Sequence, residues 1–269
     1  MAQIRAGRRA IILPRMPSPP PRAKPQAVQF FGTCLVDLLY PRVGLAGMSL
    51  IRRAGVRVLY PSGQSCCGQP AYNAGYREEA LAVAARQIEA LAGEMPVVVP
   101  SGSCAAMMRH HYPRLFAGHP LHAEAVALSR RIWELTEFLV DVLDVQAADL
   151  GPPVAVAVHT SCSARRELGA ADRIEALLDR LGNVRKVEQG RKAECCGFGG
   201  TFSVKQPALS GAMVGDKCDA IRATGAAVLV GQDCGCLMNI AGAFEKDGSG
   251  PRCAHIAEFL WERTDGRPL

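Results

Sequence analysis

Two copies of the tripeptide Cys-Cys-Gly, each flanked by two more distant cysteines, constrain this chain more than any other feature. In chain order the two sets are Cys34, Cys66-Cys67-Gly68 and Cys104, then Cys162, Cys195-Cys196-Gly197 and Cys236. The intervals are 31 and 35 residues in the first set and 32 and 38 in the second. Corresponding cysteines therefore lie 128 to 132 residues apart, and this period predicts an internal duplication.

Short apolar runs alternate with helical patterns in both halves. The runs are "AVQFF", "VRVLYP" and "PVVVPSG" in the first half, then "VAVAVHTS", "NVRKVE" and "AAVLVGQD" in the second. The stretch "REEALAVAARQIEALAG" has the periodicity of a helix. Strands that alternate with helices favour parallel sheets. The pattern predicts an α/β fold of two internally duplicated βαβ-type halves, each with a small parallel sheet.

The outer cysteines of each set come directly after a predicted strand. Ligands of open α/β sheets gather beyond the carboxyl ends of the strands, so we expect one thiol cluster in each half. The predicted organisation is a disordered, basic, proline-rich tail over 1–26, a first cysteine-rich repeat over 27–121, a linking segment over 122–150 and a second repeat over 151–269. His122–Asp144 is predicted to form one long amphipathic helix within the linking segment.

Adjacent cysteines are poorly suited to a disulfide or to a single zinc ion. Neighbouring α-carbons lie about 3.8 Å apart, whereas disulfides usually need at least about 4.4 Å. Structural zinc sites favour cysteine pairs separated by two to four residues. Two diverging thiolates can each bind a different iron of one iron–sulfur cluster, and the following glycine lets the backbone come close. Two buried small residues before a turn are the simpler interpretation of one Cys-Cys-Gly, but the flanked second copy favours clusters.

Three cysteines and one histidine stand apart from this pattern. Cys218 and Cys253 are compatible with free thiols, and Cys234 with either a fifth ligand or, in preference, a spectator thiol. His159 precedes Cys162 by three residues and could contact the cluster. We expect instead a strand-end histidine whose ring is hydrogen-bonded within the protein.

Charge and hydropathy exclude two classes of partner. The net charge of +6 is concentrated before the first acidic residue, Asp37, so the rest of the chain has no electrostatic footprint for nucleic acid. No apolar run approaches the roughly 18 residues of a membrane span. We therefore expect no direct membrane insertion. Eleven cysteines without a secretory signal indicate metal or catalytic thiols in a reducing cytoplasm.

Six motifs, in order, resemble those of the lactate utilisation protein A family, a branch of the Cys-Cys-Gly cysteine-rich-domain proteins. They are "CLVDLLYP", "QSCCGQPAYNAGY", "VVVPSGSCAAMMRHHYP", "HTSCSARRELG", "ECCGFGGTFSVK" and "CGCLMNIAG". The wider group includes the iron–sulfur subunit of glycolate oxidase and the catalytic B subunit of heterodisulfide reductase. The resemblance runs from about Val28 to the C-terminus.

The resemblance implies an iron–sulfur electron-transfer subunit of a cytoplasmic complex that oxidises L-lactate and passes electrons toward the respiratory chain. The partners would be a ferredoxin-type iron–sulfur subunit and a third subunit, through which the chain could lie peripheral to the membrane. No catalytic residue is implied. The family pattern places cluster ligands on Cys34, Cys66, Cys67, Cys104, Cys162, Cys195, Cys196 and Cys236.

One departure from the heterodisulfide reductase pattern bears on cluster type. Those relatives supply five cysteines per repeat, whereas Ser101 and Asp233 replace the fifth here. Four ligands per half favour two ordinary [4Fe–4S] clusters over a non-cubane cluster. A heterodisulfide-reductase-like thiol or small-molecule reductase remains the first alternative, and a structural or sensing metalloprotein the second.

Overall fold

The structure, a computed structural model, describes residues 23–265 and contains two four-stranded sheets in which every strand pair is parallel. The first sheet has the order β2 (Arg57–Leu59), β1 (Ala27–Phe30), β3 (Val97–Val99), β4 (Ile132–Glu134). The second has the order β6 (Val184–Lys186), β5 (Val154–His159), β7 (Val228–Gly231), β8 (Arg252–His255). This confirms the predicted α/β fold with two duplicated parallel sheets. The predicted tail, up to residue 22, lies outside the described residues.

Both sheets reverse their strand order at the same place. Gln29 of β1 pairs with Leu59 on one side and Val97 on the other, and Val156 of β5 likewise pairs with both β6 and β7. The chain therefore leaves β1 and β3, or β5 and β7, toward opposite faces of the sheet. In open parallel sheets such a switch point is where ligands bind.

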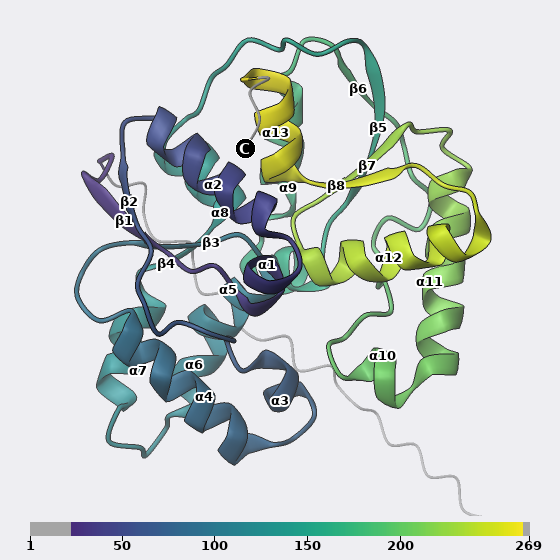
Figure 1. The fold of residues 1–269 in the computed structure, drawn as a ribbon. Helices are drawn as coiled ribbons and strands as arrows, with labels where there is room; N and C mark the ends of the chain where they lie inside the picture. The colour runs from purple at the N-terminus through teal and green to yellow at the C-terminus, as the bar shows by residue number, and fades with distance from the viewer. Residues whose placement is uncertain (1–22, 266–269) are drawn as a thin grey trace, which may run out of the picture.

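Helices surround the sheets (Figure 1). The first half contains α1 (Cys34–Leu38), α2 (Pro41–Arg53), α3 (Gln69–Asn73), α4 (Arg77–Ala90), α5 (Gly102–Ala106), the π-helical η1 (Met107–His111), α6 (Tyr112–Leu115), α7 (His122–Ser129), α8 (Leu135–Glu137) and the π-helical η2 (Phe138–Val142). The second contains the π-helical η3 (Ala164–Leu168), α9 (Ala171–Asp179), α10 (Phe202–Lys205), α11 (Pro207–Arg222), α12 (Cys234–Asp247) and α13 (Ile256–Thr264).

The long helix predicted over His122–Asp144 is wrong. Helix α7 ends at Ser129, and Ile132–Glu134 form β4, whose Ile132 pairs with Val97 of β3. All three β4 residues are buried, so a three-residue strand between two helical segments keeps the apolar content that favoured one helix. The Glu134 side chain then caps α8 by accepting hydrogen bonds from the backbone of its first turn.

The two halves interlock through their last helices. Helix α13 of the second half packs against α2 of the first, as Figure 1 shows, and α8 and η2 pack against α9. Arg53 at the end of α2 donates to the Thr264 carbonyl at 3.2 Å, and Arg180 beyond α9 donates to the Val145 carbonyl at 2.7 Å. One apolar core contains residues of both sheets, including Val28 and Val156. The arrangement matches an isologous dimer interface within one chain.

Over the described part of the chain, no helix combines the length and the apolarity that crossing a bilayer requires.

Candidate metal centres

The outer cysteines of each set lie at helix starts beyond the two central strands. Cys34 opens α1 after β1, and Cys104 lies in the first turn of α5 after β3. Cys162 lies at the helical turn that leads into η3, and Cys236 in the first turn of α12 after β7. Backbone N–H groups at a helix start favour negative charge, so these positions suit thiolates.

A polar side chain caps the start of each of these helical turns by accepting a backbone N–H bond: Thr33, Ser101, Ser161 and Asp233. Ser101 and Asp233 are the two residues that replace the fifth cysteine of the heterodisulfide reductase pattern. Their N-cap role gives a physical reason for serine and aspartate at these positions.

The glycine of each Cys-Cys-Gly motif is required by its backbone. Gly68 has φ +83° and Gly197 φ +81°, values that residues other than glycine rarely adopt. A Cβ at Gly68 would lie 3.1 Å from the Ala80 carbonyl oxygen, and one at Gly197 would lie 2.7 Å from that of Ser210. The motif is therefore held directly against the following long helix in both halves.

The same motif also directs hydrogen bonds at sulfur. The Gly68 N–H donates to the Cys66 Sγ at 3.4 Å, and the Gly197 N–H donates to the Cys195 Sγ at the same distance. The carbonyl of the second cysteine is anchored in each case, by the Tyr112 hydroxyl at 2.9 Å in the first half and by an Asn239 amide in the second.

Hydrogen bonds between side chains join the four predicted cysteines of each half. In chain order the two series are Cys34–Cys66–Cys67–Cys104 and Cys162–Cys195–Cys196–Cys236. Hydrogen bonds from its two cysteine neighbours lower the pKa of Cys66 to about 3 and that of Cys195 to about 2. Hydrogen bonding to Cys66 raises the pKa of Cys34. The structure thus brings together both predicted sets.

The two sets fit an iron–sulfur cluster by their donor chemistry. All eight donors are sulfur, the ligand type that selects soft metals and iron–sulfur clusters. Two members of each set are buried, Cys67 and Cys104 in the first and Cys196 and Cys236 in the second. Four neighbouring thiolates, two of them buried in each set, would repel one another strongly, and a multinuclear cation removes that cost. The diverging adjacent cysteines again suit several irons better than one ion.

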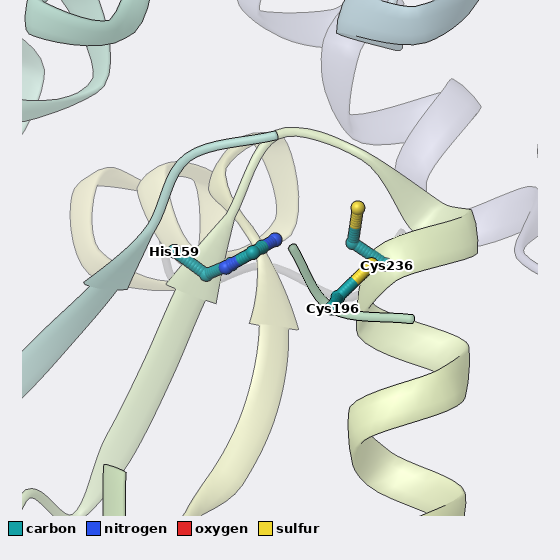
Figure 2. A group of neighbouring side chains, drawn as sticks. All are labelled: His159, Cys196 and Cys236. Carbon is teal, nitrogen blue, oxygen red and sulfur yellow. The ribbon is translucent and has the colours of Figure 1, made fainter. Parts of the chain in front are cut away.

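His159 differs from its expected role. Its ring is 1% exposed, and neither ring nitrogen has a hydrogen-bond partner. A ring nitrogen and the Sγ atoms of Cys196 and Cys236 all lie within 4.8 Å of one another, and Figure 2 shows the ring directed from the end of β5 toward these cysteines. Burial lowers the pKa of His159 to about 3. The expectation of a histidine hydrogen-bonded within the protein is wrong.

The three remaining cysteines lie outside the two series. Cys234 is buried in the apolar core that the halves share, Cys218 is buried on α11, and Cys253 lies on β8. Burial raises the pKa of each of these thiols. They have the surroundings of protonated structural thiols, which leaves four cysteines to each centre.

The two centres adjoin each other. The Asp233 carboxylate, three residues before Cys236, accepts the Ser103 N–H of the first half at 2.8 Å. A Cβ at Gly102 would lie 2.8 Å from the Ser161 Oγ, so the two strand-end turns touch. Beyond the Cys-Cys-Gly motifs, the Lys205 Nζ donates to the Tyr76 hydroxyl at 3.2 Å. Both centres therefore belong to one contiguous region.

This architecture defines the class of protein. The Cys-Cys-Gly cysteine-rich domain family matches residues 28–109 and 156–241, once in each half. Lactate utilization protein A of Geobacillus kaustophilus is 45% identical over 238 residues, which cover 88% of this chain and 99% of the relative. The Bacillus subtilis protein of the same name is 44% identical over 237 residues, with the same shares covered. The chain belongs to the lactate utilization protein A family.

A solved structure supports the fold alone. A hypothetical protein from Helicobacter pylori has a TM-score of 0.54 and 11% identity, and the likeness covers 94% of this chain and 52% of that one.

Proposed function

We propose that this chain is the iron–sulfur electron-transfer subunit of a complex that oxidises L-lactate to pyruvate and passes the electrons toward the respiratory chain. The observation that carries the proposal is the convergence of two all-cysteine sets at the switch points of two duplicated sheets. The ligands would be Cys34, Cys66, Cys67 and Cys104 for one [4Fe–4S] cluster, and Cys162, Cys195, Cys196 and Cys236 for the other.

A bound cluster of this type accepts and releases one electron at a time. The protein's part is to exclude water and to direct hydrogen bonds at sulfur. Burial of Cys67 and Cys196 serves the first purpose, and the N–H groups of Gly68 and Gly197 serve the second. The contact between the two strand-end turns provides a short path between the centres.

Family membership supports the choice of substrate and partners. Relatives that match almost end to end carry the name lactate utilization protein A. Lactate oxidation itself would take place on a sister subunit, with a ferredoxin-type iron–sulfur subunit and a third subunit as partners. The complex would be cytoplasmic and reach the membrane only through its partners.

Iron and acid-labile sulfide counts on the anaerobically purified chain test the proposal. We expect about eight of each per chain, as two four-iron clusters require. Cys196→Ser should lose about half of both, while Cys218→Ser, which changes a buried cysteine outside the two sets, should lose none. Stoichiometric zinc without sulfide would refute the proposal. Reduction of a disulfide substrate by the isolated chain would support a reductase instead.

A further inference from the structure

The duplication lets the two centres be compared residue by residue. Gly68 packs against the Ala80 carbonyl of α4, and Gly197 packs against the Ser210 carbonyl of α11. The buried positions of these two helices then correspond at a constant interval of 130 residues, from Ala80 and Ser210 to Leu91 and Ile221. A different side chain at two matched positions therefore gives the two centres different surroundings.

The first difference lies at the end of the central strand. Three residues before Cys34 stands Phe31, a fully buried ring in the same apolar cluster as Cys67 and Cys104. Three residues before Cys162 stands His159, next to Cys196 and Cys236. A phenyl ring offers no hydrogen, whereas an imidazole in either protonation state offers at least one N–H. At these two matched positions of the described chain, the second centre thus has an unpaired, buried N–H donor and the first has none.

The second difference lies on the helix behind the motif. Gln87 of α4 is buried and neutral, and its amide bonds to Ser65 at 2.9 Å. The matched Lys217 of α11 is 0% exposed, and its Nζ donates to the carbonyls of Arg191 and Lys192 at 3.0 and 3.1 Å. Arg191 and Lys192 precede Cys195 by four and three residues, so the ammonium lies behind the loop that carries the second Cys-Cys-Gly motif. A buried cation thus replaces a neutral amide beside the second centre.

The third difference lies in the helical turn that follows the first cysteine of each set, where a negative side chain in the first half is matched by a positive one in the second. Asp37 follows Cys34 by three residues, and Arg165 follows Cys162 by three. Asp37 is exposed and accepts the Tyr60 hydroxyl at 3.0 Å, whereas half-buried Arg165 donates to the Thr160 carbonyl at 3.3 Å. Arg165 therefore lies along the rim of the second centre and adds positive charge there.

One acidic residue opposes this trend. Asp233 takes the place of Ser101, but its carboxylate reaches across to the Ser103 N–H of the first half. Its negative charge therefore lies between the two centres and opposes reduction at both. Glu194, which precedes Cys195, is paired with Arg191 at 2.7 Å. The net difference between the centres is a surplus of positive charge and of N–H donors at the second.

We propose that His159, Lys217 and Arg165 make the second centre the stronger electron acceptor, so that electrons pass within the chain from the first half to the second. In each transfer one electron leaves the cluster at the first centre, which is oxidised, and enters that at the second, which is reduced. No bond is made or broken and no proton moves. The inference rests on the proposed function. Its physical basis is that buried positive charge and N–H donors stabilise the added negative charge.

A redox titration followed by EPR on the anaerobically purified full chain tests this. We expect two one-electron steps whose equilibrium constants differ at least tenfold, which corresponds to 59 mV. Cys196→Ser and Cys67→Ser assign them, because each variant keeps only the opposite centre. The step that remains in Cys67→Ser should have the higher potential.

Variants that make the second centre resemble the first provide the decisive comparison. His159→Phe and Lys217→Gln should each lower the equilibrium constant for reduction of the second centre about tenfold. Neither should change that of the first centre. Lys217→Arg keeps the charge and should leave the potential of the second centre near its native value. Gln87→Lys should raise the potential of the first centre. Lys246→Gln, which removes the same charge from an exposed position, should shift neither.

The possible failures are distinguishable. Absence of iron and sulfide from the purified chain would refute the proposed function and this inference together. Two loaded centres with equal potentials, or a higher potential at the first, would refute only the inference. An unchanged second step in both His159→Phe and Lys217→Gln, at full iron content, would show that these residues do not set the order.

Discussion

Replacing Gly197 with alanine tests how far the backbone, and not sulfur alone, shapes the second centre. Two costs are expected. The left-handed conformation at φ +81° costs a residue with a Cβ about 1–2 kcal/mol. The new Cβ would also lie 2.7 Å from the Ser210 carbonyl oxygen, so that the loop or α11 has to move. Such overpacking typically adds about 1–3 kcal/mol, for a total loss of about 2–5 kcal/mol.

Two other glycines provide matched controls. Gly68 has nearly the same φ, but its Cβ would lie 3.1 Å from the Ala80 carbonyl, so Gly68→Ala should cost less. Gly225 has φ +62° with nothing within 4 Å of a Cβ, so Gly225→Ala should cost only the conformational part, about 1–2 kcal/mol.

Urea unfolding of the anaerobically purified chains, followed by circular dichroism, measures the series. The expected order of stability loss is Gly197→Ala, then Gly68→Ala, then Gly225→Ala. Iron content should fall at one centre in the first two variants and stay complete in the third. Equal losses in all three variants would refute the reasoning, because the contact with the helix carbonyl would then contribute nothing.

Two further predictions concern buried ionisable groups in the first half. The Arg109 guanidinium binds both carboxylate oxygens of Glu137, at 3.1 and 2.6 Å, so Arg109→Met should leave an uncompensated charge and lower the free energy of unfolding by about 3–5 kcal/mol. The exposed pair of Arg86 serves as control, since Arg86→Met should change it by less than about 1 kcal/mol in the same urea assay, and similar losses would contradict the burial argument. Burial raises the pKa of Glu134 to about 8 from an ordinary 4.5, so the folded chain keeps a proton that the unfolded chain loses. Its contribution to stability is therefore fully present below about pH 4.5 and falls by up to about 1.4 kcal/mol per pH unit as the pH rises toward 8. Glu134→Gln should remove this decline, and an unchanged difference in unfolding free energy between pH 5 and pH 8 would count against it.

The repeat could be predicted because its markers are local in sequence. Short β-branched runs such as "VVVP" favour strands of a parallel sheet when helices separate them, and cysteines at the carboxyl ends of such strands are then expected to lie close together. The role of Gly68 and Gly197 could also be predicted in part, since glycine after a ligand commonly relieves the backbone. The carbonyls of Ala80 and Ser210 that require it could not, because they come from a helix more than ten residues away.

Other features depend on contacts between segments that are distant in the sequence, and no local pattern predicts them. The buried strand at Ile132 lies within a stretch that has an overall helical pattern, and its pairing with Val97 distinguishes it. Buried imidazoles usually have hydrogen-bond partners, and the sequence around His159 does not reveal that both of its ring nitrogens lack one. Gln87 and Lys217 lie 130 residues apart, one more than the 129 that separates Gly68 from Gly197, so an ungapped alignment of the halves at these glycines misses the match.

The exchange of final helices between the halves has a consequence for how such a chain could arise. Half of this molecule, taken alone, would leave bare the face of α2 that α13 covers, and two identical halves could cover each other only as a symmetric pair. A pair of that kind holds equal sites and has no preferred direction for charge. Once both copies are encoded in tandem, position 31 can diverge from 159 and position 87 from 217, and the two sites need no longer be equal.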